Sequence, residues 1–489
     1  MSFPRKTLPY VAIWFIYASL IIFGVLYHEP WRDEAHPWMK ARETPLGIIV
    51  SEDIRNEGTP ILWFLILKPF APAGFPYLTM SFIHAGLAIT AVYILLRFAK
   101  LPMLLKILFP FTYYMAYEYS VISRNYVLTV LLTFAIAALY DKRLTKPILY
   151  SLLISLLFQT NSFSILPAGV FMMLFVFDIL RKKLLAPGTI LSVAVLSVSA
   201  AFTFLTLRNG AARIINYPPD NPLLELPVII RNAIVPSFPQ HPAAPFLSPE
   251  INTIITILTA LLIPGILLFL WRNTHIFILC VSTVSWWLYV NLYVHKGSIR
   301  HHGLLLIYLV VFFWLGGIDQ KPLTPVRQAV RSVLLVSLAV LFTVSLGYTK
   351  YIYSADYTYA SSGARDMATY LKQNNLDKYD TVAYIASHGL AVLPYLNNKQ
   401  FWYPEFGAKG YYNTSDNRYH ALFFSLSTYD AFRRIDRAFP PGKPVLLLLS
   451  FPLPDEESAG YSLLHTSGAT YFWSNETENL WLYGRGIAL

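Results

Sequence analysis

Long apolar runs without charges alternate with short polar turns along the first 348 residues. The first run covers residues 9–27, and further runs lie near residues 76–98, 101–117, 125–140, 147–162, 163–180, 184–206, 251–271, 276–294, 303–318 and 332–348. A helix of about 20 apolar residues spans the hydrocarbon core of a bilayer. The pattern predicts a polytopic α-helical membrane protein with about 11 transmembrane helices. The first run is too long for the core of a signal peptide and lacks a small-residue cleavage site, so we expect it to be retained.

The positive charges between these runs indicate which loops face the cytoplasm. Lys and Arg collect in the turns near residues 5–6, 97–106, 141–146, 181–183, 272–275 and 321–331. Cytoplasmic loops hold an excess of both residues. The outward-facing segments are then residues 28–75, 118–124, 207–250, 295–302 and the chain after residue 349. The apolar run 59–70 would reverse this order if it crossed, so we predict a short juxtamembrane helix there in the outer leaflet.

The composition changes after residue 348, where long apolar runs end and charges, Asn and Gly become ordinary. We therefore expect a transmembrane domain over residues 1–348 and an extracytoplasmic soluble α/β domain over residues 349–489. Periodicity within the second domain predicts helices at 363–373, 389–396 and 428–439. It predicts strands at 381–386 and 444–450 and closing strands within 461–483.

Composition agrees with a membrane protein, because 55% of the 489 residues are hydrophobic and only 13% are charged. The net charge of +11 is explained by topology signals and lipid headgroups, so no nucleic-acid partner is expected. The single cysteine, Cys280, lies in a predicted span and forms no intramolecular disulfide.

The first outward segment opens on the sequence Trp-Arg-Asp-Glu-Ala-His at residues 31–36. Ionised carboxylates beside the hydrocarbon region are costly unless they have a function. We take Asp33 as a candidate catalytic base, since a carboxylate can accept the proton of an acceptor hydroxyl. Glu34 is a second candidate catalytic residue beside it. Glu34 and His36 are also candidates to tune the base, orient the acceptor or share a divalent cation such as Mg²⁺ or Mn²⁺. The alternative is a hydrated loop with a helix N-cap at Asp33.

A second candidate group is the basic segment at residues 295–303, which breaks the positive-inside pattern on the outer side. Its potential donors suit a lipid phosphate, and the candidate phosphate-binding residues are Lys296, Arg300, His301 and His302. The alternative is a loop that faces lipid headgroups. Adjacent histidines lack the usual spacing of zinc ligands.

Glu118 and Arg124 lie in the outward segment between the third and fourth predicted spans. Glu118 is placed to steer an acceptor or a divalent cation, with Arg124 beside it. A structural ion pair between the two residues is an equal alternative.

This layout resembles the GT-C membrane glycosyltransferases, in particular the protein mannosyltransferase-like and lipid A aminoarabinose transferase-like branch. The resemblance rests on the Asp33-Glu34 pair after the first span, the Thr59-Pro60-Ile61-Leu62-Trp63-Phe64 run, and Glu118 with Ser123-Arg124-Asn125-Tyr126. It implies that the first-loop acid is the base, that second-loop residues hold acceptor or donor, and that the donor is a polyprenyl-phosphate sugar. Many relatives have His-Pro-Pro where this chain has Glu57-Gly58-Thr59-Pro60, and Ala-Arg-Pro-Tyr in the second loop. The substrate-binding role of Glu57 and the role of Asn125 therefore stay open.

Together these features predict an inverting glycosyltransferase of the bacterial inner (plasma) membrane that uses a polyprenyl-phosphate donor and a cell-envelope glycan, glycolipid or protein acceptor. Its active site and C-terminal domain face outward, and a divalent cation is an optional cofactor. One alternative is a transporter or flippase of lipid-linked sugars, which would place ionisable residues in mid-span. Another is a noncatalytic envelope scaffold.

Overall fold

The computed structural model describes residues 8–54, 59–207, 220–236, 247–317, 324–384, 389–396, 399–410, 426–453, 460–467 and 478–487. It is 69% helical and has a small sheet near its C-terminus. The chain forms two compact units. The helical unit lies within residues 1–26, 57–63 and 81–353, and the C-terminal unit lies within residues 27–56, 64–80 and 354–489.

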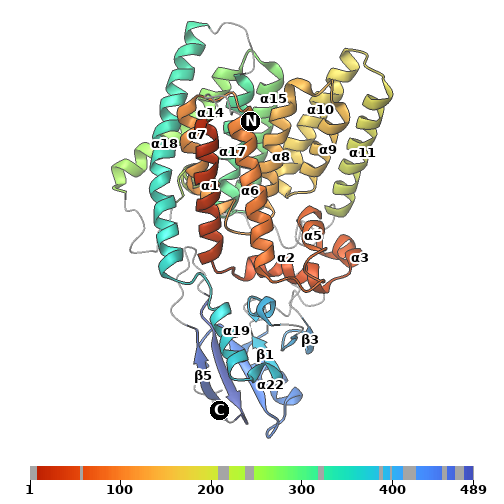
Figure 1. Ribbon diagram of the computed structural model, residues 1–489, viewed down its shortest axis with the longest axis vertical. Helices are drawn as coiled ribbons and strands as arrows, with labels where there is room; N and C mark the ends of the chain where they lie inside the picture. The colour runs from red at the N-terminus through yellow and green to blue at the C-terminus, as the bar shows by residue number, and fades with distance from the viewer. Residues whose placement is uncertain are drawn as a thin grey trace. The chain divides into compact units, whose positions relative to one another are not determined.

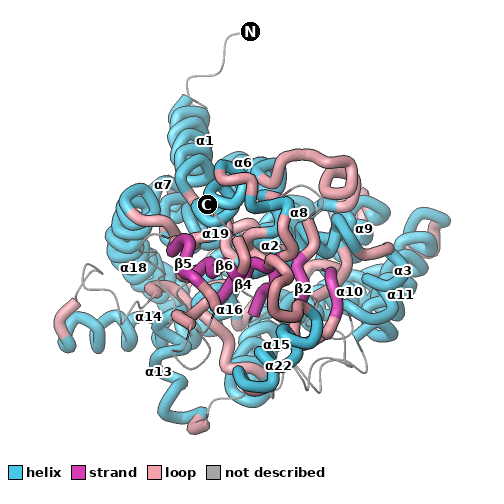
Figure 2. Tube along the Cα trace, turned by 90° about the horizontal axis from the view of Figure 1, so that it is seen from below, coloured by secondary structure: helices cyan, strands magenta, loops and turns pink. Residues whose placement is uncertain are grey.

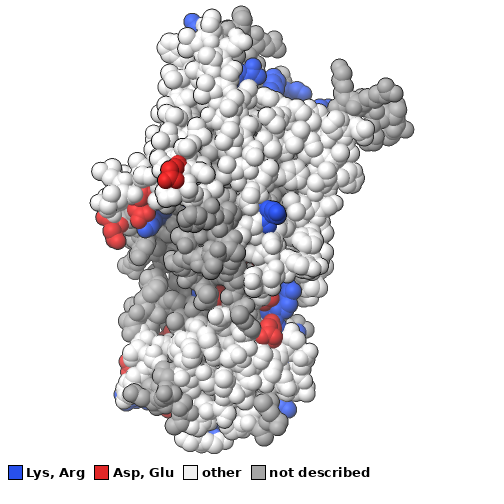
Figure 3. All heavy atoms as spheres, turned by 90° about the vertical axis from the view of Figure 1, so that its left-hand side faces the viewer, with Lys and Arg blue, Asp and Glu red and all other residues white. Residues whose placement is uncertain are grey.

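Eight helical stretches of the described chain are long and apolar enough to cross a membrane (Figure 1). Five of them are single helices, namely α1 (Leu8–Tyr27), α6 (Leu78–Phe98), α11 (Pro187–Leu207), α14 (Pro249–Leu270) and α18 (Pro325–Thr358). The other three combine short helical turns with α10 (Ile165–Arg181), α15 (Thr274–Tyr289) and α17 (Leu304–Gly316). Figure 3 shows that the helical unit is almost free of charged side chains over most of the drawn face. These helices have the length and composition of membrane spans, as predicted.

The runs 101–117, 125–140 and 147–162 are not among these eight stretches. The first of them is divided into α7 (Met103–Leu108), a 3₁₀ turn at Phe109–Phe111 and a π-helix at Tyr114–Glu118. Pro110 lies in the 3₁₀ turn, where its missing N–H interrupts regular α-helical bonding. The next two runs form α8 (Tyr126–Leu139) and α9 (Pro147–Phe158). The number of crossings therefore stays a prediction.

The core of the helical unit is built around α17, whose residues from Leu304 to Gly316 are all buried. Helices α8, α14 and α15 pack against it. By contrast, α11 has most of its apolar side chains on the surface, including Val198 and Phe204. Exposed apolar surface of this kind suits a lipid environment rather than water.

The C-terminal unit contains a six-stranded sheet with the order β3-β2-β1-β4-β6-β5 (Figure 2). The strands are β1 (Thr381–Tyr384), β2 (Phe401–Tyr403), β3 (Ala408–Gly410), β4 (Val445–Leu449), β5 (Ser462–Thr466) and β6 (Trp481–Arg485). The central strand β1 pairs in parallel with β2 and β4, and the remaining pairs are antiparallel. The predicted strands within 381–386, 444–450 and 461–483 are confirmed.

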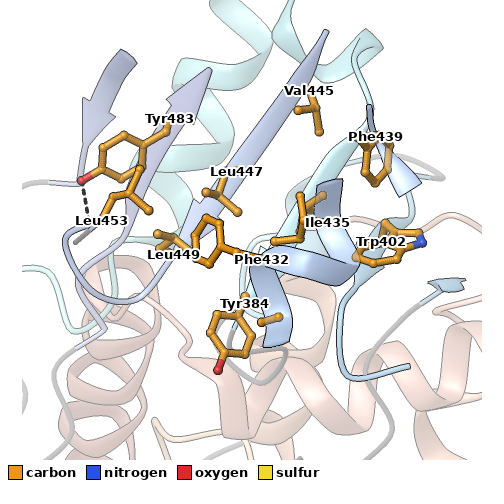
Figure 4. Close-up of a cluster of buried hydrophobic side chains, with 12 residues drawn as sticks. Tyr384, Trp402, Phe432, Ile435, Phe439, Val445, Leu447, Leu449, Leu453 and Tyr483 are labelled. Atoms are coloured by element: carbon orange, nitrogen blue, oxygen red, sulfur yellow. Dashed lines mark hydrogen bonds between the residues drawn. The ribbon is translucent and has the colours of Figure 1, made fainter. Parts of the chain in front are cut away.

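Two amphipathic helices accompany this sheet, α19 (Ala364–Gln373) and α22 (Thr428–Ala438). Both confirm the predicted helices. The hydroxyl of Ser427 caps the start of α22. The apolar residues Phe432 and Ile435 of this helix pack with Leu447 and Leu449 of β4 (Figure 4). In the same cluster the hydroxyl of Tyr483 accepts a hydrogen bond from the N–H of Leu453 at 2.9 Å (Figure 4).

The predicted continuous helix over residues 389–396 is wrong. Gly389 is helical, residues 390–392 form a turn, and Leu393–Tyr395 form a 3₁₀ helix. Pro394 lies inside this segment, and proline prevents the backbone bonding that an α-helix requires beyond its first turn.

The C-terminal unit also includes segments of the first outward loop, which the sequence does not predict. These segments contain α2 (Arg32–Glu43), α3 (Leu46–Ile48), a π-helix at Ile49–Asp53 and part of α5 (Leu62–Leu67). The rings of Trp38 and Tyr77 lie 5.9 Å apart, and Tyr77 in turn meets Tyr395 edge-on at 5.3 Å. The first loop thus packs on the C-terminal segment through buried aromatic rings. Helix α5 lies within the run predicted as a juxtamembrane helix.

Candidate functional site

The acidic sequence after the first span forms the start of α2. Trp31 is the N-cap, and Glu34 reaches back to accept a hydrogen bond from the backbone N–H of Trp31 at 3.3 Å. Asp33 therefore lies in the first helical turn, and the alternative that made Asp33 an N-cap is wrong. Carboxylates are favourable there because the helix N-terminus carries partial positive charge. Asp33 is half-buried, whereas Glu34 is fully buried.

His28 links this turn to the end of α18. Its Nε2 atom is 2.9 Å from Glu34 Oε2, and its Nδ1 atom is 2.8 Å from Asp356 Oδ2. Burial alone would lower the pKa of His28, but the two carboxylates together raise it to about 10. The ring is therefore an imidazolium that donates from both nitrogens. Asp356 also accepts a hydrogen bond from the Ser361 hydroxyl at 2.5 Å.

Two further buried carboxyl groups bind the starts of helices in the same unit. Glu29 Oε1 accepts the backbone N–H of Arg365 at 2.7 Å, and Glu478 Oε1 accepts the backbone N–H of Arg32 at 3.0 Å. Burial raises the pKa of each carboxyl to about 7, although the neighbouring arginine and backbone N–H oppose that shift. The sequence predicts a role for neither residue, because the residues around each of them do not distinguish it from an ordinary surface acid.

The other first-loop candidates give less information. His36 lies in α2 one turn after the acidic pair and is half-buried. Glu57 lies outside the described residues, so its predicted role stays a prediction.

The second-loop candidates belong to the helical unit. Glu118 ends the π-helix, is buried, and accepts a hydrogen bond from the Tyr113 hydroxyl at 2.7 Å. The backbone carbonyl oxygen of Arg124 lies 3.1 Å from His84 Nε2, and the Ser120 carbonyl oxygen lies 3.2 Å from His84 Nδ1. The ring of His84 in α6 thus lies between two carbonyl oxygens of this loop, a contact that the sequence did not indicate.

The basic segment has a defined fold in the helical unit. It turns at Gly297, which has a positive φ of 72°, and continues into α16 (Ile299–His302). His301 caps this helix, since its Nδ1 accepts the backbone N–H of Ser298 at 2.8 Å. Lys296 reaches Glu225 Oε1 at 2.7 Å, and its carbonyl oxygen is 3.0 Å from His302 Nε2.

The structure brings the second loop and the basic segment together. The Tyr119 hydroxyl donates to the Arg300 carbonyl oxygen at 2.7 Å, and the Tyr126 hydroxyl is 2.8 Å from His301 Nε2. Tyr119 directly follows Glu118, and Tyr126 lies two residues after Arg124. Two of the three predicted groups are therefore neighbours within one compact unit, while Asp33, Glu34 and His36 belong to the other.

A neutral polar network beside these loops was not predicted. The Asn125 side chain donates to the Thr160 carbonyl oxygen at 2.8 Å, and the Thr129 hydroxyl donates to the Thr160 hydroxyl at 3.0 Å. The Tyr308 hydroxyl reaches Ser164 at 3.2 Å. The only sequence signal was the polar stretch Gln159-Thr160-Asn161-Ser162 between two apolar runs.

Within the described ranges, no group of three or more His, Cys, Asp or Glu side chains is arranged to hold a metal ion. The predicted divalent cation stays a prediction. No protein-family model matches the sequence, and no curated protein matches it.

Proposed function

We propose that this protein is an inverting membrane glycosyltransferase that moves a sugar from a polyprenyl-phosphate donor to a cell-envelope glycan, glycolipid or protein acceptor. The main support is the start of α2. Asp33 is half-exposed there, while the carboxyl groups around it, those of Glu29, Glu34 and Glu478, are buried and bonded. Asp33 is thus the most accessible acid of the group, and it lies at the positive end of a helix.

The proposed reaction assigns one role to Asp33 and another to the basic segment. The Asp33 carboxylate takes the proton of the acceptor hydroxyl while that oxygen attacks the anomeric carbon. The bond from this carbon to the donor phosphate oxygen breaks, and the polyprenyl phosphate leaves with the electron pair. Because the acceptor oxygen attacks from the face opposite the leaving phosphate, the configuration at the anomeric carbon is inverted. Lys296, Arg300, His301 and His302 are assigned to the leaving phosphate, because preorganised cations and N–H donors stabilise developing negative charge.

The remaining candidates have supporting roles in this proposal. Glu34 positions the first turn of α2, since its carboxylate is buried between His28 and a backbone N–H. Glu118 and Arg124 position substrate beside the basic segment, and His36 and Glu57 stay assigned to substrate. The proposal includes the GT-C architecture with about 11 crossings, the location in a bacterial inner membrane and an outward-facing C-terminal domain.

The first experiment compares the wild-type protein with the Asp33→Asn variant. Transfer of radiolabelled sugar from synthetic polyprenyl-phosphate donors to extracted envelope acceptors is measured on purified protein. Loss of the general base predicts a rate lower by roughly 10²–10⁴-fold. The control is Glu43→Gln, which removes another half-buried carboxylate at the far end of α2.

Equal rates for wild type and Asp33→Asn would contradict the base assignment. If the folded wild-type protein transfers sugar from none of the donors, the transporter or scaffold alternative gains weight. Transfer assays with and without a chelator decide whether Mg²⁺ or Mn²⁺ takes part.

A further inference from the structure

Two helices of the C-terminal unit begin with backbone N–H groups that are bound by acids from distant parts of the chain. The first N–H groups of any helix have no partner within that helix. Arg32 at the start of α2 donates to Glu478, which lies near the C-terminus. Arg365 at the start of α19 donates to Glu29, which lies just before α2. Each segment therefore supplies the acid that binds the other segment's helix start.

Further bonds hold Glu478 and the first turn of α2 in place. The backbone carbonyl of Glu478 accepts the N–H of Gly363 at 3.1 Å, directly before α19. His28 connects Glu34 of α2 with Asp356 at the end of α18. The first turn of α2 is thus fastened to Glu478 directly. The residues just before it, His28 and Glu29, reach Asp356 and Arg365 through their side chains.

The burial of these groups makes the contacts mutually dependent. Glu34 is 0% exposed, Glu478 1%, His28 2% and Glu29 8%. A buried charge is tolerated only when it is paired and hydrogen-bonded. Removing either segment would leave several of these groups without partners, so neither arrangement is expected to persist alone.

We propose that the C-terminal segment, residues 354–489, is a clamp that positions the first turn of α2. Glu478 is its positioning residue in that segment, and His28 and Glu29 are the positioning residues of the first loop through which Asp356 and Arg365 act. The clamp itself follows from the geometry alone. Its consequence for catalysis rests on the proposed function, because it holds Asp33 in one orientation.

The clamp contains titratable groups that respond to pH in the same direction. Glu29 faces Arg365, Asp366 and His28, Glu478 faces Arg32, Asp33 and Ser362, and His28 faces Glu34 and Asp356. The phenol groups of Tyr77 and Tyr395 lie among the same carboxylates.

The sign follows from the pKa of each group in the clamped and the released state. Glu29 and Glu478 have a pKa of about 7 when clamped against an ordinary value of 4.5, so the clamped state holds more protons and loses stability as pH rises from about 4.5 to about 7. His28 has a pKa of about 10 against an ordinary 6.5, so its contribution is complete below about 6.5 and disappears as pH rises through about 10. The clamp is therefore tighter at pH 5 than at pH 8.

Hydrogen exchange of the full-length protein in detergent tests this inference without requiring any activity. The variants are Glu478→Ala, which removes the acceptor, and Glu478→Gln, which keeps an acceptor oxygen but cannot ionise. The control is Asp436→Asn, which changes an exposed acid on α22. Exchange is followed in peptides covering the start of α2 and in β4, at pH 5 and pH 8, after correction for intrinsic rates.

We expect Glu478→Ala to speed exchange at the start of α2 by about tenfold or more, because the Arg32 N–H loses its acceptor. β4 and the control variant should stay unchanged. Glu478→Gln should weaken the pH dependence of α2 protection. Unchanged α2 exchange in Glu478→Ala overturns the clamp. If β4 also loses protection in Glu478→Ala, the Glu478→Gln variant provides the test. A pH dependence of α2 protection equal to that of wild type overturns the clamp, and a weaker pH dependence supports it.

These outcomes are separate from those of the transfer assay. If Glu478→Ala alters exchange but the wild-type protein transfers no sugar, the clamp stands and the proposed function fails. If transfer depends on Asp33 but exchange is unchanged in Glu478→Ala, the proposed function stands and the clamp fails.

Discussion

His28 is held as a cation by two carboxylates that come from different parts of the chain. Glu34 is six residues away in sequence, whereas Asp356 is 328 residues away. Taking three charges out of water is costly, and the cost is offset only while all three remain together. The imidazolium is therefore a fixed structural charge rather than a group that exchanges protons near neutral pH.

Replacing His28 tests this role at the scale of one residue. His28→Leu leaves Glu34 and Asp356 buried without their shared cation, so we expect a loss of about 3–5 kcal/mol in stability and a lower apparent melting temperature. His28→Gln should lose less, because an amide can still donate to one carboxylate. Melting is followed by tryptophan fluorescence in detergent between pH 6 and pH 10.

The wild-type melting temperature should fall across this range, because the unfolded chain releases the His28 proton above a pH of about 6.5 while the folded protein keeps it up to about pH 10. Both variants should show a weaker slope. The control is His465→Gln, which removes a partly exposed histidine paired with Asp366, and it should change stability by less than about 1 kcal/mol. A His28→Leu variant as stable as wild type would show that the buried carboxylates do not depend on the imidazolium.

At the scale of secondary-structure elements, the junction between α16 and α17 determines the shape of the basic segment. Gly303 joins the two helices with ordinary helical angles, so its backbone does not require glycine. Its surroundings do, because a Cβ atom at this position would overlap the ring of Tyr114. Close approach of Tyr114 to α16 therefore depends on the missing side chain.

We expect Gly303→Ala to reduce stability by about 1–3 kcal/mol, as overpacking of a tight core does. The matched control is Gly347→Ala in α18, where a Cβ would meet no atom within 4 Å. That change should leave stability equal or slightly higher, since alanine favours helix. Thermal unfolding of both variants measures the difference, and equal melting temperatures would contradict the packing argument.

At the scale of the whole molecule, the C-terminal unit includes parts of the first loop, although residues 81–353 of the helical unit separate them in sequence. Both sets of residues must therefore emerge on the same side of the membrane. The distribution of Lys and Arg predicts that this is the outer side.

Cysteine labelling tests this orientation. Cys280 is buried, so the protein has little reactive background. In a Cys280→Ser background, Lys372→Cys on α19 should react with a membrane-impermeant maleimide in intact cells. Lys142→Cys, at an exposed turn assigned to the cytoplasm, should react only after permeabilisation. The opposite pattern would reverse the predicted topology.

The amino-acid sequence by itself determined the class of the protein and most elements of its C-terminal domain. Apolar runs of sufficient length indicated membrane helices, and local periodicity indicated α19, α22 and β4. The basic cluster at residues 295–303 was visible from composition alone. These features are local, because helix and strand periods depend on backbone geometry over a few residues.

Only the tertiary structure decided which polar groups meet. Glu29 and Arg365 are 336 residues apart, Arg32 and Glu478 are 446 apart, and no local pattern selects these partners. Likewise, Tyr126 and His301 meet across 175 residues. The physical reason is that burial brings such groups together: once apolar packing excludes water, each buried charge and helix-end N–H must find a partner, wherever in the chain that partner lies.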